Sequence, residues 1–169
     1  MKKALAIIAA PLFILILNYF LLGIPSNSAI DEDTRNKGIN TWVHYEFFVN
    51  PQSLVIDLRK VDMDKSTADV FRVLFQVAEK FQDKNFTKVI LTSKGKKKFY
   101  IQGDYFKEIG SEYTYQNPVY LLRTFPENTY MLGGTKAYST WTGGVFGVMK
   151  EQMEDLDDLA YKWFKEDLF

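Results

Sequence analysis

TWVHYEFFVNPQSLVIDL, residues 41–58, is the stretch of sequence that decides the fold. Its two outer runs, 41–49 and 54–58, are rich in aromatic and β-branched residues, which favour strands. Between them lies Asn50-Pro51-Gln52-Ser53, whose residue types favour a turn. The stretch therefore predicts an antiparallel β-hairpin.

Two further hairpins are predicted downstream. Residues 87–93 and 98–102 flank a basic turn, Lys94-Gly95-Lys96-Lys97. Residues 129–132 and 135–140 flank Gly133-Gly134, and paired glycines accept the positive φ angles of a hairpin turn.

Helices are predicted between the hairpins and at the end of the chain. Ser66 and Asp69 form a capping box at the start of a helix that ends near Phe81. Shorter helices are predicted over residues 104–113 and from Asn117-Pro118 to just before Pro126. Over residues 145–168 an amphipathic helix presents an apolar stripe to the sheet, made of Val145, Met149, Met153, Leu156, Ala160 and Trp163. This order predicts an α+β fold, an antiparallel sheet built from three hairpins with helices packed on one face.

The front of the chain predicts a hydrophobic helix that enters the membrane. Residues 4–22 carry no charge, and Lys2 and Lys3 precede them. A run of about 20 apolar residues spans a bilayer, and basic residues on one flank hold that flank in the cytoplasm. We therefore expect residues 1–25 to be an anchor or signal peptide, 26–40 a polar tether, and 41–169 a domain outside the cytoplasm.

Whether this segment is cleaved is left open by the sequence. Ser26-Asn27-Ser28 before Ala29 is an acceptable signal-peptidase site, which would release the domain into the periplasm. The apolar run is longer than the 7 to 15 residues of a typical signal peptide, which favours an uncleaved anchor.

Composition narrows the classes of function. The chain has 21 basic and 21 acidic residues, so no nucleic-acid partner is indicated. It contains no cysteine, which excludes disulfides, zinc-thiolate sites and a cysteine nucleophile. No motif for a cofactor or a metal ion is present in its sequence, so neither is expected.

A hydrolase is one alternative that the sequence allows. His44 lies two residues from Glu46 on a predicted strand, so the two side chains share a face and could form an acid/base pair. Asp57 and Asp104 are further carboxylates that could join them. No nucleophile with a sequence signature accompanies these residues, so enzymatic activity is less expected than binding.

A lipid-binding module is a second alternative. Lys94, Lys96, Lys97 and Lys98 form the densest cluster of like charge, at the tip of a predicted hairpin. On a tethered domain these lysines could touch anionic head groups.

The first hypothesis is an accessory domain that recognises another envelope protein. Aromatic side chains and arginine are enriched at recognition surfaces. The predicted surface consists of Tyr105, Tyr113, Tyr115, Tyr120, Arg123 and Phe125.

Overall fold

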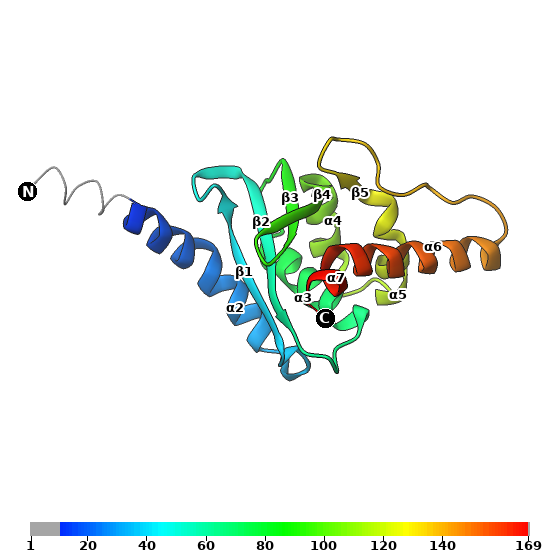
Figure 1. The fold of residues 1–169 in the computed structure, drawn as a ribbon, viewed down its shortest axis with the longest axis horizontal. Helices are drawn as coiled ribbons and strands as arrows, with labels where there is room; N and C mark the ends of the chain where they lie inside the picture. The colour runs from blue at the N-terminus through cyan, green and yellow to red at the C-terminus, as the bar shows by residue number, and fades with distance from the viewer. Residues whose placement is uncertain (1–10, 169) are drawn as a thin grey trace, which may run out of the picture.

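Five strands form one mixed sheet in the order β1-β2-β3-β4-β5 in the computed structural model, which describes residues 11–168 (Figure 1). The strands are β1 (Ile39–Glu46), β2 (Asn50–Val61), β3 (Lys88–Ser93), β4 (Lys96–Gln102) and β5 (Thr129–Met131). The α-helices are α2 (Ile24–Asp31), α3 (Thr67–Lys80), α4 (Gly103–Glu112), α5 (Pro118–Thr124), α6 (Val145–Ala160) and α7 (Glu166–Leu168). Short 3-10 turns occupy Thr34–Asn36 and Pro126–Asn128, and π-helical turns occupy Tyr19–Gly23 and Tyr161–Lys165. The α+β class predicted from the sequence is confirmed.

The sheet is not antiparallel throughout, so that part of the prediction is wrong. The hairpins β1–β2 and β3–β4 are antiparallel as expected, but β2 and β3 pair in parallel. The reason is the connection between them: α3 carries the chain from one end of β2 back to the other, so that β3 starts beside the start of β2.

The third predicted hairpin is reduced to a short strand and one bridge. β5 pairs antiparallel with β4 over three residues, and Tyr130 bridges Lys136 across the turn that contains Gly134. Residues after Ala137 form no strand within the part of the chain that the structure describes.

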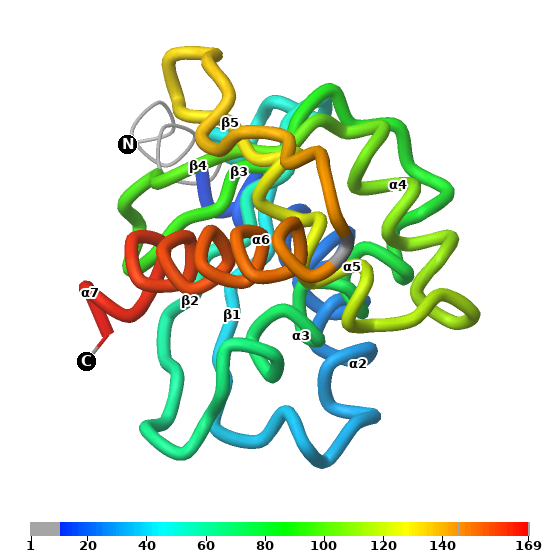
Figure 2. The backbone as a smooth tube through the Cα atoms, turned by 90° about the vertical axis from the view of Figure 1, so that its right-hand side faces the viewer, coloured from blue at the N-terminus to red at the C-terminus, as the bar shows by residue number. Residues whose placement is uncertain are grey.

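The hydrophobic core lies between the sheet and its helices. Side chains along a strand point to opposite faces in turn, so Leu54 and Ile56 on β2 face the same side as Val89 on β3. Phe71 and Phe75 of α3 belong to the same buried cluster. Figure 2 shows α2, α3 and α4 together on one side of the strands. The predicted capping box starts α3: Ser66 accepts from the Asp69 N–H, and Asp69 accepts from the Ser66 N–H.

One continuous helix, Pro11–Asp31, runs beside β1 and is long and apolar enough to cross a membrane. Its exposed residues are mainly apolar, yet Leu22 is fully buried in the domain core. Asn18 accepts a hydrogen bond from the backbone N–H of Tyr45 on β1 at 2.9 Å. The helix is therefore packed against the sheet over its second half; residues 4–10 of the predicted anchor lie outside the described residues.

The predicted polar tether over residues 26–40 is wrong, because this segment is packed. Ser26 and Ile30 of α2 and Asn36 beyond it are buried. Their polar groups are satisfied internally: the Ser26 hydroxyl donates to the Leu22 carbonyl at 2.7 Å, and the Asn36 amide donates to Gln76 of α3 at 2.6 Å. Polar composition alone did not distinguish these bonded side chains from solvated ones.

The final helix packs on the core with only part of its predicted stripe. Leu156, Ala160 and Trp163 are buried, whereas Met149 and Met153 are exposed. The first half of α6 extends beyond the strands (Figure 1), so the sheet does not cover it. The side chain of Val145, the first residue of the stripe, lies outside the described part.

Substitutions in the buried and the exposed half of this stripe should differ in their effect on stability. Leu156→Asp places an unpaired charge in the core and should destabilise the domain by at least about 3 kcal/mol. Met153→Asp, one turn earlier, should leave stability within about 0.5 kcal/mol because its site is open to water. Thermal and urea unfolding of the full chain in detergent micelles measures both; equal effects would contradict the observed packing.

Candidate functional site

His44 lies among aromatic rings rather than beside a carboxylate partner. Its ring stacks on Phe48 with centroids 4.4 Å apart and lies 4.8 Å from Trp42. The Nδ1 atom is 2.8 Å from the carbonyl oxygen of its neighbour Tyr45. Burial lowers the pKa of His44 below its ordinary value, and none of the described carboxylates hydrogen-bonds to it.

The carboxylates proposed as its catalytic partners have other bonds. Glu46 is held by Lys97 at 2.5 Å; burial acts to raise the pKa of Glu46, but Lys97 and Lys88 keep it below its ordinary value. Asp57 pairs with Arg59 at 2.8 Å and accepts from the Gly95 N–H at 2.9 Å. Asp104 lies exposed in the first turn of α4. Glu46 and Asp57 are thus used in ion pairs, and none of the three carboxylates bonds to His44, so the arrangement gives no support to the hydrolase alternative.

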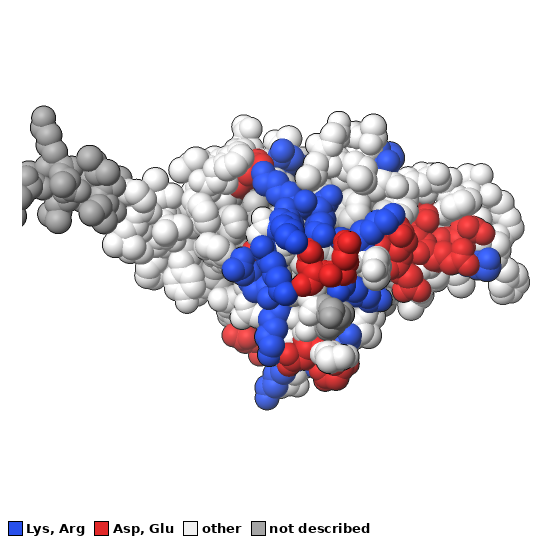
Figure 3. All heavy atoms as spheres, viewed as in Figure 1, with Lys and Arg blue, Asp and Glu red and all other residues white. Residues whose placement is uncertain are grey.

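The lysines of the β3–β4 turn are tied to the end of the C-terminal helix. The Asp167 carboxylate forms ion pairs with the ammonium groups of Lys96 at 3.1 Å and Lys98 at 2.8 Å. The Lys94 ammonium donates to the Asp167 backbone carbonyl at 2.7 Å. Hydrogen bonds from Lys98 and Lys96 lower the pKa of Asp167 to about 2. Figure 3 shows Lys and Arg side chains gathered around this acidic group, so the basic cluster is largely used in internal pairs.

The aromatic segment predicted as a binding surface is divided by the fold. Phe125 is fully buried in the core, Tyr113 is half-buried against Phe75, and Tyr115 is exposed. Arg123 donates to Gln152 of α6 at 2.5 Å and lies 5.1 Å above the Tyr120 ring. The remaining predicted residues, Tyr105 and Tyr120, line a common pocket.

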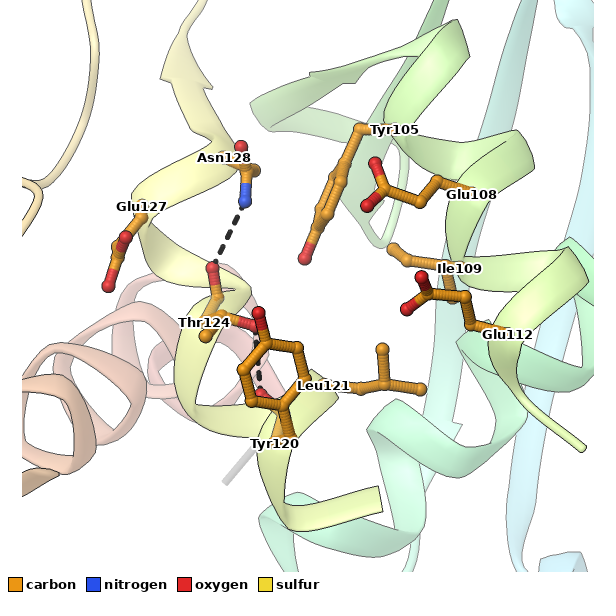
Figure 4. A pocket seen from close by; sticks show the side chains of 9 residues that line it. All are labelled: Tyr105, Glu108, Ile109, Glu112, Tyr120, Leu121, Thr124, Glu127 and Asn128. Carbon is orange, nitrogen blue, oxygen red and sulfur yellow. Dashed lines mark hydrogen bonds between the residues drawn. The ribbon is translucent and has the colours of Figure 1, made fainter. Parts of the chain in front are cut away.

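This pocket lies between α4 and the segment from α5 to Asn128, and its volume is about 190 Å³ (Figure 4). Its lining comprises Tyr105, Glu108, Ile109, Glu112, Tyr120, Leu121, Thr124, Glu127 and Asn128. Small-molecule pockets usually measure about 300–1,000 Å³, so the size fits one side chain better than a cofactor. α5 is set in place by Asn117, whose side chain accepts from the Val119 N–H at 2.9 Å, with Pro118 at the first helical position.

The hydroxyl of Tyr105 points into this pocket close to Asn128 and Thr124. The oxygen is buried, and neither Asn128 nor Thr124 beside it completes a bond: the Asn128 amide donates to the Thr124 carbonyl at 3.2 Å, and the Thr124 hydroxyl to the Tyr120 carbonyl at 2.8 Å. Burial raises the pKa of Tyr105 above its ordinary value. An unsatisfied buried hydroxyl costs about 1–3 kcal/mol, which a ligand that bonds to it would recover.

Two carboxylates enter the same space from α4. Glu108 and Glu112 are one turn apart, and neither has an ion pair or a side-chain hydrogen bond to any residue in 11–168. Glu127 differs, because its carboxylate accepts from the Gln152 amide. The sequence analysis missed all three; the spacing of four between Glu108 and Glu112 was visible, but the closure of the pocket by α5 was not.

Other kinds of site find less support. Among residues 11–168, no group of three or more His, Asp or Glu side chains is placed to hold a metal ion. A neighbouring hollow of about 210 Å³ contains Arg35 and Arg72, but Asp33 and Asp69 already pair with both guanidinium groups. The pocket between α4 and α5 is therefore a candidate with unused hydrogen-bonding groups.

Comparisons with protein-family models, with curated proteins and with solved structures gave no match to this chain. The assignment of function therefore depends on the geometry of the chain itself.

The unpartnered hydroxyl predicts an unusual effect of mutation. Tyr105→Phe removes a buried group that lacks a bond, so the domain should become more stable by about 1 kcal/mol. Tyr138→Phe is the matched control, because the Tyr138 hydroxyl donates to Asp158 at 2.7 Å and its loss should destabilise by about 1 kcal/mol. Urea unfolding of both variants measures the sign of each change in unfolding free energy. A loss of stability in both would mean that the Tyr105 hydroxyl has a hydrogen-bond partner.

Proposed function

We propose that this chain is a membrane-anchored domain outside the cytoplasm that binds another envelope protein by accepting a basic side chain in the pocket between α4 and α5. The observation that carries the proposal is the unbonded hydroxyl of Tyr105 beside the unpaired Glu108 and Glu112. Insertion of one side chain is favoured over turnover of a substrate because the pocket, about 190 Å³, is smaller than the usual small-molecule pocket.

The pocket chemistry matches a lysine or arginine side chain. An ammonium or guanidinium group donates several hydrogen bonds and accepts none, and the pocket offers the acceptors Tyr105, Glu108 and Glu112. The Tyr120 ring, which is exposed in the lining, supplies apolar contact for the alkyl stem of such a side chain. Bonds between charged groups are about twice as strong as neutral ones, so one inserted cation can anchor an interface.

Membrane anchoring is supported by the N-terminal helix. The described part, Pro11–Asp31, is long and apolar enough to cross a bilayer. Lys2 and Lys3 precede the apolar run and Asp31, Glu32 and Asp33 follow it, and such an asymmetry keeps the N-terminus in the cytoplasm.

Packing of this helix favours the uncleaved anchor over the cleaved signal. The segment Ser26-Asn27-Ser28 lies inside α2, and Ser26 is fully buried. Proteolysis needs an accessible segment that can leave its hydrogen bonds, which a packed helix does not provide. Cleavage before Ala29 would also remove Leu22 from the core and uncover the edge of β1.

The anchor predicts the form of the protein in cells. The chain recovered from membranes should keep residues 1–28, and it should stay in the pellet after alkaline extraction because its apolar helix remains in the lipid. Intact mass and N-terminal sequencing measure this. A soluble product that begins at Ala29 would contradict the anchor.

The pocket predicts selective binding of basic side chains. The probes are four short peptides that differ only at a central Arg, Lys, Gln or Glu, added to the full chain in micelles. The Arg and Lys peptides should bind most tightly, and Glu108→Gln or Glu112→Gln should weaken them about 5- to 10-fold, since each removes a charged acceptor. Fluorescence anisotropy of the labelled peptides measures binding.

The matched control is Glu154→Gln on α6, which makes the same change of net charge outside the pocket and should alter binding less than 2-fold. Equal binding of the Arg and Gln peptides, or an equal loss in all three variants, would contradict recognition in the pocket.

A further inference from the structure

The turn between β1 and β2 exposes large apolar side chains. Of its residues 47–49, Phe47 is 72% exposed and Val49 is 63% exposed. Phe47 and Phe48 have positive φ angles of 53° and 64°, a conformation that bulky residues rarely adopt. Turns with two successive positive φ angles usually contain Asn-Gly, so the two phenylalanines adopt a backbone conformation that their residue type disfavours.

The N-terminal helix holds this turn in place through Asn18. The Asn18 amide donates to the Phe48 carbonyl at 2.6 Å, and its oxygen accepts from the Tyr45 N–H at 2.9 Å. A hollow between helix and turn is lined by Ile14, Leu17, Asn18, Tyr45, Phe48, Val49 and Pro51, and is largely apolar. Figure 1 shows the β1–β2 turn on the same side of the molecule as the beginning of the helix.

The position of this contact along the helix sets its depth. The apolar run of the sequence ends at Leu22, which sets the outer boundary of the bilayer core near residue 23. At 1.5 Å per residue, Asn18 then lies about 8 Å inside the outer boundary of the core. The turn that bonds to Asn18 lies at a similar depth. At this depth the surroundings are hydrocarbon, so the exposed side chains of the turn have to be apolar.

The turn is built for such an environment. The N–H groups of Phe48 and Val49 donate to the carbonyls of Tyr45 and Glu46 at 2.8 and 3.3 Å, and Pro51 has no N–H. Among the described residues, the N–H of Phe47 has no hydrogen-bond partner. Backbone groups that are bonded internally enter lipid without the usual penalty, and this holds for two of the three N–H groups of the turn. Asn18, the strongly polar residue of the apolar run, is itself only 4% exposed.

Groups suited to the lipid head groups lie at the base of the turn. The ammonium of Lys97 is 4.6 Å from the centre of the Phe47 ring. Lys97 and Lys88 share the single carboxylate of Glu46, which leaves net positive charge there. Trp42 on β1 is 39% exposed, and its ring lies 5.3 Å from that of Phe48. Tryptophan has the kind of amphipathic ring that is enriched at membrane interfaces.

We infer that the turn at residues 47–49 is a second membrane contact, inserted into the outer leaflet of the bilayer beside the helix. This inference rests on the part of the proposed function that places residues 4–22 in the membrane, and it is independent of the pocket. Two attachment points, a helix and a rigid turn bonded to it, fix how the domain faces the bilayer.

The experiment uses the absence of cysteine from the chain, which allows single cysteines to be introduced without interference. The full-length protein is reconstituted in phosphatidylcholine–phosphatidylglycerol vesicles with one cysteine each in Phe47→Cys, Phe13→Cys and Met63→Cys. Phe13 lies on the exposed face of the helix, and Met63 is 89% exposed just beyond β2, at the far end of that strand from the turn. Each cysteine carries an environment-sensitive fluorophore, which is quenched by nitroxide-labelled lipid from within the bilayer or by iodide from water.

The probe at position 47 should be quenched by nitroxide lipid at least 3-fold more than the probe at 63, and iodide should quench it at least 3-fold less. The probe at 13 should behave like that at 47. Val49→Cys repeats the measurement on the other exposed residue of the turn, and thermal unfolding shows that each labelled variant is folded.

If the probes at 47 and 49 match the one at 63 while the probe at 13 is quenched by lipid, the turn lies in water and the inference is wrong although the anchor stands. If the probe at 13 is also open to iodide, the helix is not in the bilayer, and the anchor fails together with the inference.

Discussion

The edge of β1 sets the constraint on which the rest of the structure depends. An edge strand leaves backbone N–H and C=O groups without partners, and such an edge can pair with another chain. In this molecule the helix Pro11–Asp31 covers the edge, and Asn18 supplies both an acceptor for the Tyr45 N–H and a donor for the Phe48 carbonyl. An apolar helix is thereby a structural part of the domain, because Leu22 completes the core.

This coupling has a functional consequence. In the proposed membrane arrangement, a flexible tether would let the domain rotate freely over the bilayer, whereas a packed helix would give it one orientation. Helix α5 lies toward the other end of the molecule from the beginning of the N-terminal helix (Figure 1). The pocket that α4 and α5 line therefore lies away from the membrane in the proposed arrangement. A partner that inserts a basic side chain would approach from that side, without competition from lipid for the cation.

Features coded by neighbouring residues could be predicted, and features made by distant segments could not. The helix at Ser66 was readable because its cap needs only four consecutive residues. The parallel pairing of β2 with β3 depends on where α3 returns the chain, which no local pattern states. Asn36 looks like a tether residue until Gln76 of α3 is placed beside it. In the same way, Glu108 and Glu112 become a candidate site only when α5 closes the space beside them.

Energetics favour an apolar contact with the membrane over the electrostatic one that the lysine cluster suggested. A lysine near an anionic surface gains about 1 kcal/mol, but Lys96 and Lys98 would first have to leave Asp167. Burying a Phe or Val side chain fully gains about 1.5–3 kcal/mol, so Phe47 and Val49 together offer roughly 3 kcal/mol even when insertion is partial. Their attraction needs no ion pair to break and is not screened by salt. The strained turn therefore explains, better than the lysines do, why this domain would lie against a bilayer.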